Sequence, residues 1–522
     1  MEDKLPKPIE WLLPIVTCFI GLHFTILGVC HCNLSMIPGD LGDTRFNMYI
    51  LEHGFQFITR QVHYFWGAPF FYPFSPALAL SDNLIGSMPV YATFRILSFD
   101  RETAFQLWFI MLCILNFFAT FYVLKKLTNH TILALVGAYV FAFSIFHFSQ
   151  FNHAQTFPRF IMPLVIYWMI RYFENYKLKY FWMMITGIAY QFYCGMYLGI
   201  YLSLTGFILF LILLSLNYRD AQRKRFFSGS NLYDIAFPLS VFILMLMPIA
   251  IPYLRFYSIT SYRNYNDTFA TIPIPSSYFF SHIASIPWYK LSLIGIRDNC
   301  PWWDQTLFVG IIPWLGMIAS IVFFFKKGFI ASNKALFSIL ITLLICILLT
   351  TRFGNFTLFK WLFKLPGISS MGTVPRIMNM FVLFFAMIPC LLMNSIIKKR
   401  RMLWFSILLL AIIIDNSSQP SLAFSFNKQK AQARVNAIVE KLHKVDWKGK
   451  QAFAYMPDSG NESEIQIDGM MASQLIHKPC VNGYSATSPK GFAGFWLSFN
   501  ERELYNWLDF NQMDHATIVQ IK

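Results

Sequence analysis

Long runs of apolar residues recur along this chain, and they limit its possible folds more than any other feature. A helix that crosses a bilayer needs about 20 mostly apolar residues, because the hydrocarbon core is about 30 Å thick. Hydrophobic residues make up 56% of the 522 residues, and Lys and Arg gather in short clusters between the apolar runs. Such a chain must place apolar surface against lipid. We therefore expect a polytopic α-helical membrane protein.

Eleven segments are predicted to span the membrane. The run from Tyr180 to Leu216 is too long for one span and is interrupted by Gly195 and Gly199, so it is divided into two helices. The predicted spans are 11–31, 104–124, 131–149, 158–173, 180–195, 198–216, 233–254, 306–325, 335–351, 376–397 and 402–418.

The basic clusters predict the orientation of these spans, because Lys and Arg concentrate in cytoplasmic connections. They occupy every second connection: Lys4 and Lys7; Lys125 and Lys126; Arg171, Lys177 and Lys179; Arg219, Arg223, Lys224 and Arg225; Lys326, Lys327 and Lys334; and Lys398, Lys399, Arg400 and Arg401. Loops 32–103, 150–157, 255–305 and 352–375 and the C-terminal tail then lie on the far side. We interpret the net charge of +16 as this topological signal, and we expect no nucleic-acid partner.

The tail differs in composition from the rest of the chain. After Pro420 it becomes polar, and residues 427–444 have apolar side chains at helical spacing. Strands are predicted at 451–456 and 516–521, and further helices at 463–475 and 500–510. We therefore predict a membrane domain over 1–419 and a small extracytoplasmic α/β domain over 420–522.

Two aspartates follow the first span, in the segment MIPGDLGDTRFNMYILEHG. Asp43 is placed to cap an amphipathic helix over 44–59 that lies on the membrane surface. Asp40 then lies one turn earlier, near the N–H groups and positive dipole end that attract phosphate. An aspartate at such a position is commonly no more than a cap. Two carboxylates at this spacing also suit a divalent cation such as Mg or Mn, or a base held in place by its neighbour.

Other charged residues on the far side are candidates for substrate or phosphate binding, although hydrogen bonding at the interface and snorkelling also explain them. The principal ones are Arg45, Glu52, His53, Arg60, His63, His153, Arg159 and Arg376. Taken singly, Asp82, Arg95, Arg263, Asp267, Arg297, Asp298 and Asp304 cannot be told from solvated loop charges.

The segments GDLGDTRFNMYILEHG and FWGAPFFYPFSPALALSDN resemble the first outer loop of GT-C type membrane glycosyltransferases, in particular bacterial YfhO-like proteins. HAQTFPRF, LPGISSMGTVPRIMN and KPCVNGYSATSPKGF extend the resemblance over most of the chain. It implies a GT-C-like bundle in the bacterial cytoplasmic (inner) membrane. The implied enzyme is an inverting transferase that moves a sugar from a polyprenyl-phosphate donor to a lipid, glycan or protein acceptor.

The resemblance also implies that an aspartate of the first outer loop is the base or a metal ligand. That role falls on Asp40 or Asp43, and we favour Asp40 as base with Asp43 as its support or cap. The chain departs from the family pattern at one position. Gly372 stands in the stretch before the tenth span where the resemblance leads us to expect an arginine, so Arg376 is the remaining positively charged residue there.

Two other classes of function compete with a transferase. A flippase or transporter of a lipid-linked sugar usually carries ionisable residues within its spans, whereas here the predicted spans hold almost none and His23 is the clearest exception, which favours chemistry at one face. A catalytically inactive scaffold with the same fold is the second alternative. Replacing Asp40 and Asp43 with Asn discriminates among the three classes of function. A transferase should lose its product, a flippase should retain some activity, and a scaffold should be unaffected.

Overall fold

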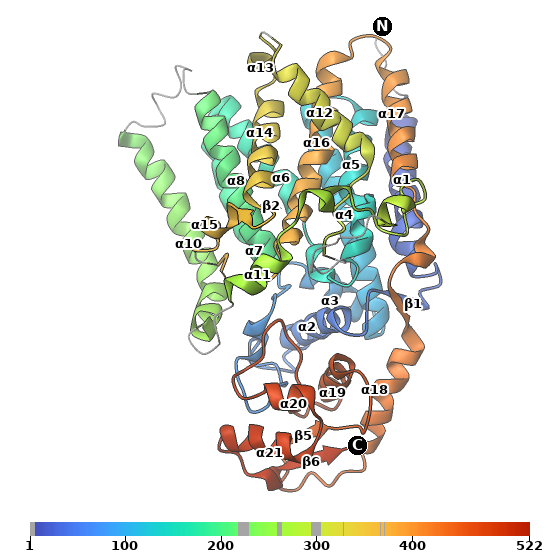
Figure 1. The fold of residues 1–522 in the computed structure, drawn as a ribbon, viewed down its shortest axis with the longest axis vertical. Helices are drawn as coiled ribbons and strands as arrows, with labels where there is room; N and C mark the ends of the chain where they lie inside the picture. The colour runs from blue at the N-terminus through green and yellow to red at the C-terminus, as the bar shows by residue number, and fades with distance from the viewer. Residues whose placement is uncertain are drawn as a thin grey trace.

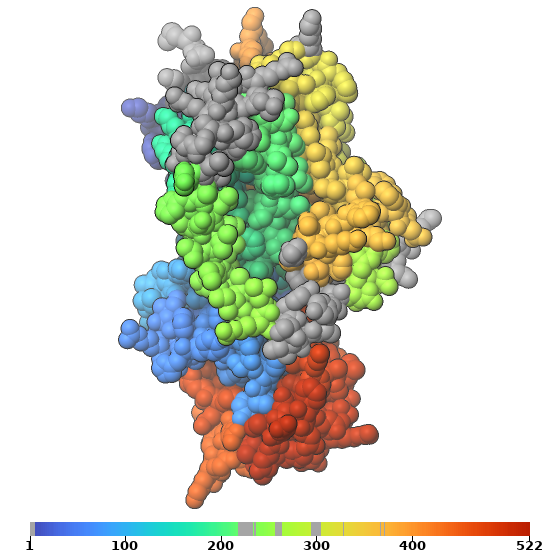
Figure 2. Space-filling view, turned by 90° about the vertical axis from the view of Figure 1, so that its left-hand side faces the viewer, coloured from blue at the N-terminus to red at the C-terminus, as the bar shows by residue number. Residues whose placement is uncertain are grey.

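The computed structural model describes residues 6–217, 229–257, 264–293, 304–326, 328–365, 367–369 and 371–522. A helical bundle occupies one end of the molecule and the C-terminal segment, residues 420–522, occupies the other (Figure 1). The first long loop lies between them, and Figure 2 shows it in blue, on one side of the molecule, between the red C-terminal segment and the green helices. Lys4, Arg219, Arg223, Lys224, Arg225, Arg263, Arg297, Asp298 and Lys327 lie outside the described residues.

Each of the eleven predicted spans corresponds to a helix. The bundle helices are α1 (Lys7–Leu22, continued by a π-helical turn His23–Leu27), α4 (Arg101–Thr128), α5 (Thr131–Phe143), α6 (Ile161–Asn175), α7 (Leu178–Cys194), α8 (Met196–Leu216), α10 (Gly229–Tyr257), α12 (Ile311–Phe324), α14 (Lys334–Leu349), α16 (Met378–Ile396) and α17 (Arg401–Asp415). Among the described residues, six helical stretches are long and apolar enough to cross a membrane. α6, α7, α12, α14 and α17 have only 14 to 17 residues, so the number of crossings stays a prediction.

The core of the bundle is built on α5 and α16. All thirteen residues of α5 are buried, as are fifteen of the nineteen in α16. Both sequences are apolar on every side, which is the pattern of a helix surrounded by other helices. α5 packs against α1, α4, α16 and α17, and α16 packs against α12 and α14.

Short elements connect the bundle helices. They are β1 (Met36–Pro38), α2 (Asp43–Ile58), Ala77–Leu80, α3 (Met88–Ile96), Ile145–Gln150, Ala154–Thr156, α11 (Tyr265–Thr271), Pro275–Phe279, Tyr289–Leu293, α13 (Phe329–Ser332), β2 (Arg352–Phe353), β3 (Phe356–Thr357), α15 (Phe359–Leu362) and Val374–Ile377, where elements without a label are single 3-10 turns. β2 and β3 form a small antiparallel hairpin.

The C-terminal segment contains the predicted helices and strands close to their expected positions. Its elements are the 3-10 turn Pro420–Leu422, β4 (Ser425–Asn427), α18 (Lys428–Leu442), β5 (Ala452–Tyr455), α19 (Glu462–Ile476), α20 (Ala493–Leu497), α21 (Glu501–Phe510), the 3-10 turn His515–Thr517 and β6 (Ile518–Ile521). β5 and β6 pair in parallel, with Ala452 opposite Ile518. β4 pairs antiparallel with β1 of the first loop, with Met36 opposite Asn427.

The expectation that the first-loop helix lies on the membrane surface is wrong. Twelve of the sixteen residues of α2 are buried, because the helix packs on α3 and α4 on one side and on α19 on the other. Its charged residues are matched by ion pairs: Arg45 with Asp468, and Glu52 with Arg95. α2 is therefore an internal element between the bundle and the C-terminal segment (Figure 1).

Candidate active site

Asp40, not Asp43, caps the start of α2. The Asp40 Oδ1 atom accepts hydrogen bonds from the backbone N–H groups of Gly42, at 3.2 Å, and Thr44, at 3.1 Å. The Asp43 side chain makes no capping bond, so the capping role predicted for it is wrong. The physical reason is the turn before the helix: Gly39, at φ +99°, reverses the chain and carries Asp40 back over the first helical turn.

The Asp43 carboxylate is held by two residues from distant parts of the chain. Its Oδ2 atom lies 3.0 Å from Nδ1 of His153, which precedes the Ala154–Thr156 turn. Its Oδ1 atom accepts a hydrogen bond from the hydroxyl of Tyr484 in the C-terminal segment. The backbone carbonyl of Asp43 accepts a bond of 2.8 Å from Asn47 Nδ2, which also donates to Gln155. Asp43 therefore lies where the first loop, the bundle and the C-terminal segment meet.

His153 lies at the centre of this cluster. Besides Asp43, it has the Asp304 carboxylate 3.7 Å from its Nε2 atom. The Arg376 guanidinium comes within 3.3 Å of its Nδ1 atom and also lies over the Tyr197 ring, 5.2 Å from the centroid. We call Asp43, His153, Asp304, Arg376 and Tyr484 the junction cluster. It places two carboxylates, an imidazole, a guanidinium and a phenol within mutual reach.

The surroundings of Asp43 stabilise its ionised form. Burial opposes ionisation, but the hydrogen bond and positive charge of His153, the Tyr484 hydroxyl and the Arg376 charge outweigh it and lower the pKa of Asp43 to about 2. For His153, burial and the Arg376 charge lower the pKa, whereas Asp304 and Asp43 raise it, and the net pKa is raised. Burial and the nearby Asp43 charge raise the pKa of Asp40. At neutral pH Asp43 is therefore a carboxylate facing positive charge.

The other sequence-predicted residues of α2 lie away from the junction cluster. Arg45 is fully buried and forms an ion pair of 2.6 Å with Asp468. Glu52 binds Arg95 at 2.8 Å and accepts a bond from the Tyr91 hydroxyl. His53 Nε2 lies 2.8 Å from the carbonyl of Phe65. Arg60 and His63, just beyond the helix, are exposed.

Arg159 lies under the cluster and contacts two of its members indirectly. Its Nη1 atom donates to Asn379 Oδ1 at 2.6 Å, and the Asn379 amide donates to the backbone carbonyl of Arg376 at 3.0 Å. The same amide reaches Gln150, whose backbone carbonyl accepts from the His153 N–H. Arg159 therefore supports the backbone positions of Arg376 and His153 and does not face the cluster itself.

Comparisons with known proteins give limited information. No family model matches the sequence, and no curated protein sequence matches it. The apo oligosaccharyltransferase of Archaeoglobus fulgidus is similar in structure with a TM-score of 0.45 and 12% identity, over 97% of this chain and 69% of that one. The arabinofuranosyltransferase AftD from Mycobacteria is similar with a TM-score of 0.46 and 12% identity, over 92% of this chain.

The chain spans 32% of the AftD chain. At TM-scores below 0.5 these likenesses carry no argument about activity.

Sequence reasoning did not find Tyr484 and gave little weight to Asp304. Tyr484 belongs to KPCVNGYSATSPKGF, one of the segments that carry the GT-C resemblance, which was the one available signal. Asp304 looked like any other charge in a loop. Both reach the cluster only through tertiary contacts that no local pattern encodes. A third acid, Asp82, accepts a bond of 2.6 Å from the Met196 N–H and so caps α8.

The predicted divalent cation does not fit the donor set of the described residues. Among them, no group of three or more His, Cys, Asp and Glu side chains is placed to hold a metal ion. Asp40 Oδ1 is bound by two backbone N–H groups, and both oxygens of Asp43 have partners. The expected carboxylate pair is therefore not arranged as a ligand pair.

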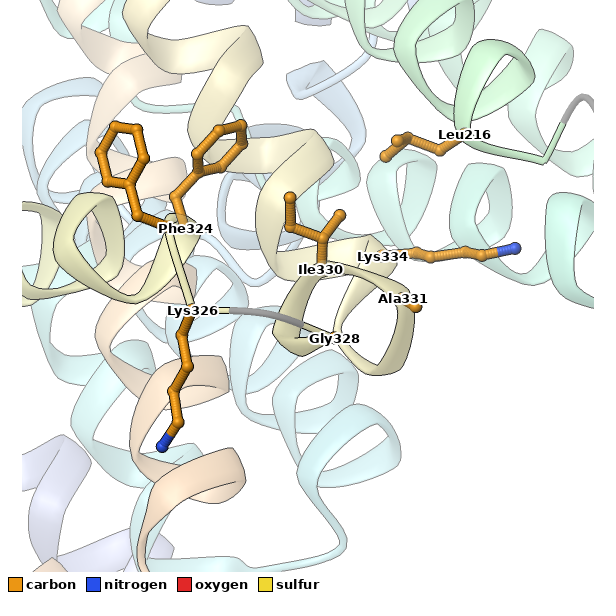
Figure 3. Close-up of a pocket in the computed structure, with 8 residues that line it drawn as sticks. Leu216, Phe324, Lys326, Gly328, Ile330, Ala331 and Lys334 are labelled. Atoms are coloured by element: carbon orange, nitrogen blue, oxygen red, sulfur yellow. The ribbon is translucent and has the colours of Figure 1, made fainter.

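Two surface hollows lie at the end of the bundle farthest from the C-terminal segment. One, of about 420 Å³, lies among the ends of α8, α12, α13 and α14 and is lined by apolar side chains together with Lys326 and Lys334 (Figure 3). The other, of about 510 Å³, lies between the starts of α7 and α10. Neither is lined by an acid or a histidine, so neither offers the chemistry of the junction cluster.

Proposed function

We propose that this chain is a membrane glycosyltransferase that moves a sugar from a polyprenyl-phosphate donor to a hydroxyl of an extracytoplasmic lipid, glycan or protein acceptor. One observation carries the proposal: the Asp43 carboxylate lies beside His153 and Arg376 at the face of the bundle that carries the C-terminal segment. Sugar transfer from a phosphate needs a proton acceptor and positive charge near the leaving group, and this cluster contains both.

The reaction is a single displacement. The acceptor O–H gives its proton to Asp43 while its oxygen forms a bond to the anomeric carbon. The bond between that carbon and the phosphate oxygen breaks, and its electron pair leaves with the polyprenyl phosphate. Arg376 and protonated His153 neutralise the negative charge that develops there. One displacement from the opposite side inverts the anomeric carbon.

In this proposal Asp43 takes the role of base that the sequence favoured for Asp40. The Oδ1 atom of Asp40 accepts hydrogen bonds from two backbone N–H groups, whereas the Asp43 carboxylate lies near the imidazole of His153 and the guanidinium of Arg376. A pKa of about 2 makes Asp43 a weak base. It suffices if the acceptor oxygen loses its proton late, after bond breaking to the phosphate has begun. Asp40 is then the residue that shapes the turn on which Asp43 lies.

The position of the cluster suits a donor whose lipid stays in the bilayer. Arg376 precedes α16, and His153 lies between α5 and α6, so both stand at helix ends of the bundle. We propose that the bundle crosses a bacterial cytoplasmic membrane eleven times and that this face is extracytoplasmic. The basic residues at the opposite helix ends, such as Lys125, Lys326 and Lys398, support that orientation.

A Mg or Mn requirement stays an untested prediction, and no step above is assigned to a cation. Both oxygens of Asp43 already have partners, and Arg376 lies nearby, so Asp43 alone does not offer a cation site. A cation would therefore have to arrive bound to the donor phosphate. If Arg376 and His153 supply all the positive charge, a chelator such as EDTA should leave turnover unchanged. If a cation enters with the donor, EDTA should lower turnover.

A flippase for a lipid-linked sugar is the second candidate, favoured by one observation. Arg159, His147 and Asn379 form a polar network that is buried inside the bundle. Buried ionisable groups of this kind often mark a substrate path through a membrane protein. Here Arg159 is bonded to His147 and Asn379, and through Asn379 it supports the backbone of Arg376, so we rank transfer above passage.

The test uses the full-length protein in nanodiscs with radiolabelled farnesyl-phosphate hexoses and pentoses as donors. Asp43→Asn should lower turnover about 100-fold or more, the usual effect of removing a general base. Asp40→Asn is the matched control, because an amide oxygen can still accept the two backbone N–H bonds, and its turnover should stay near that of the wild type. Equal losses in the two variants, or full activity in Asp43→Asn, would contradict the proposal.

A flippase and a scaffold predict different results in the same experiment. A flippase would translocate a fluorescent lipid-linked sugar across proteoliposomes in both the wild type and Asp43→Asn. A scaffold would consume no donor in any variant. Inversion is read by NMR from the anomeric configuration of the product.

A further inference from the structure

Tyr484 is the one member of the junction cluster that comes from the C-terminal segment. Its hydroxyl donates a hydrogen bond to Asp43 Oδ1. The ring lies between two aromatic side chains, with centroids 5.5 Å from Phe46 of α2 and 5.7 Å from Trp496 of α20. The backbone N–H of Tyr484 donates to the sulfur of Met470 at 3.1 Å. The phenol is therefore held firmly against the carboxylate.

The two oxygens of Asp43 face different parts of the molecule. Oδ2 faces His153, with Arg376 beyond it, on the side of the helical bundle. Oδ1 faces Tyr484, on the side of the C-terminal segment. Among the described residues that contact or act on Asp43, the positive charges that a donor phosphate needs, His153 and Arg376, lie on the bundle side. The oxygen left for an acceptor is the one that Tyr484 occupies.

A phenol that donates to a carboxylate has the same geometry as an acceptor alcohol about to lose its proton. Burial and the Asp43 charge raise the pKa of Tyr484, so the phenol keeps its proton and does not act as a nucleophile itself. With Tyr484 in place, its hydroxyl also competes with water for Oδ1 of Asp43. A phenol hydroxyl in the place of the acceptor hydroxyl would slow hydrolysis of the donor until an acceptor binds.

We propose that the Tyr484 hydroxyl occupies the place of the acceptor hydroxyl, and that a carbohydrate acceptor enters between the start of α2 and α20 and displaces it. Trp496 is half-buried beside Tyr484 and offers its ring as a wall for the C–H face of a sugar. The C-terminal segment then supplies both the acceptor subsite and its resting occupant. This inference rests on the proposed glycosyltransferase function.

Tyr484→Phe tests the inference, because it removes the hydroxyl and keeps the ring between Phe46 and Trp496. The assay uses full-length protein in nanodiscs with the farnesyl-phosphate sugars described above, and methyl glycosides of glucose, galactose and mannose as acceptors. Without acceptor, Tyr484→Phe should release sugar into water about tenfold faster than the wild type, the scale of losing one hydrogen bond to a charged group. With acceptor, its KM for the glycoside should fall by a similar factor.

Two further variants make the result specific. Tyr72→Phe is the matched control: the Tyr72 hydroxyl also joins the first loop to the C-terminal segment, by a bond of 2.6 Å to Gln451, but it is not part of the junction cluster. It should change neither hydrolysis nor acceptor KM. Trp496→Ala should raise acceptor KM several-fold without raising hydrolysis.

Three results would overturn the inference. Tyr484→Phe could leave hydrolysis and acceptor KM at wild-type values, or it could lower kcat at unchanged KM, which is the behaviour of a proton relay or a structural contact. In both cases the Asp43→Asn loss would still stand, so the proposed function would survive. If the wild type consumes no donor, the proposed function fails and the acceptor subsite falls with it.

Discussion

At the scale of single residues, Asp40 and Asp43 show what the sequence determines and what it leaves open. Their spacing and their glycine neighbours predicted that one would cap the helix and the other would be free for chemistry. Which one does which depends on the turn at Gly39, whose positive φ brings Asp40 back over the helix start. Glycine permits that conformation but also permits others, so the capping role was predicted for the wrong aspartate.

The Asp43–His153 pair predicts a pH-dependent stability. The lowered pKa of Asp43 contributes stability that is complete above its ordinary pKa of about 4 and is lost as the pH falls toward about 2. The raised pKa of His153 contributes stability that is complete below about 6.5 and is lost as the pH rises through the raised value. The wild type should exceed Asp43→Asn most between about pH 4 and 6.5, by roughly 2 kcal/mol.

The measurement is the difference in unfolding midpoint between the two proteins across that range. It should shrink at pH 9 and at pH 3. Asp415→Asn is a suitable reference, because Asp415 caps α12 and its described partners are two backbone N–H groups and the Trp288 indole, not a histidine. A difference that does not vary with pH would show that the pair is not ionised as described.

At the scale of elements, α2 depends on partners from the two ends of the chain. Its apolar positions predicted a helix correctly, within a residue at each end. Its polar positions predicted a solvent-exposed face, whereas Arg45 is buried and forms an ion pair with Asp468 of α19. The sequence could not show this, because a charge that meets its partner inside the protein looks the same as one that meets water.

The Arg45–Asp468 ion pair should be more costly to break than to replace. Asp468→Asn leaves the fully buried Arg45 without its counter-charge, and should lower the free energy of unfolding by about 3–5 kcal/mol. The double variant Arg45→Met/Asp468→Leu should lower it less, because no unpaired charge remains in α2. Denaturant unfolding in detergent measures both.

Arg434→Met is the control for this pair. Arg434 also binds Asp468, at 2.6 Å, but its side chain is 40% exposed. Removing it should cost under about 1 kcal/mol, as for most exposed ion pairs. A double variant that is less stable than Asp468→Asn would contradict the argument.

At the scale of the whole molecule, hydrophobic pattern predicted where the helices of the bundle lie, whereas the domain boundary that composition placed at residue 420 stays a prediction. α18, β5, α19, α21 and β6 also appear where periodicity placed them. The assembly of these parts was not predictable. Contacts such as that of Tyr484 with Asp43 join residues that are distant in sequence and carry no shared local pattern.

Native Cys32 offers a test of the proposed orientation. It is exposed just before β1, on the face that carries the C-terminal segment, while the other cysteines in the described parts of the chain are buried. In a Cys300→Ser background, a membrane-impermeant maleimide added to intact spheroplasts should label Cys32. Cys32→Ser should abolish the label. Labelling that appears only after permeabilisation would place this face in the cytoplasm.

The pairing of β1 with β4 has a consequence for biosynthesis. β1 follows the first bundle helix and β4 follows the last, so the two strands cannot meet before the ribosome has delivered all the bundle helices and the chain as far as Asn427. Closing so long a loop is slow compared with forming the helices between its ends. The pairing that joins the loop bearing Asp43 to the C-terminal segment should therefore form late, after α3 and α4 are already available to pack against α2.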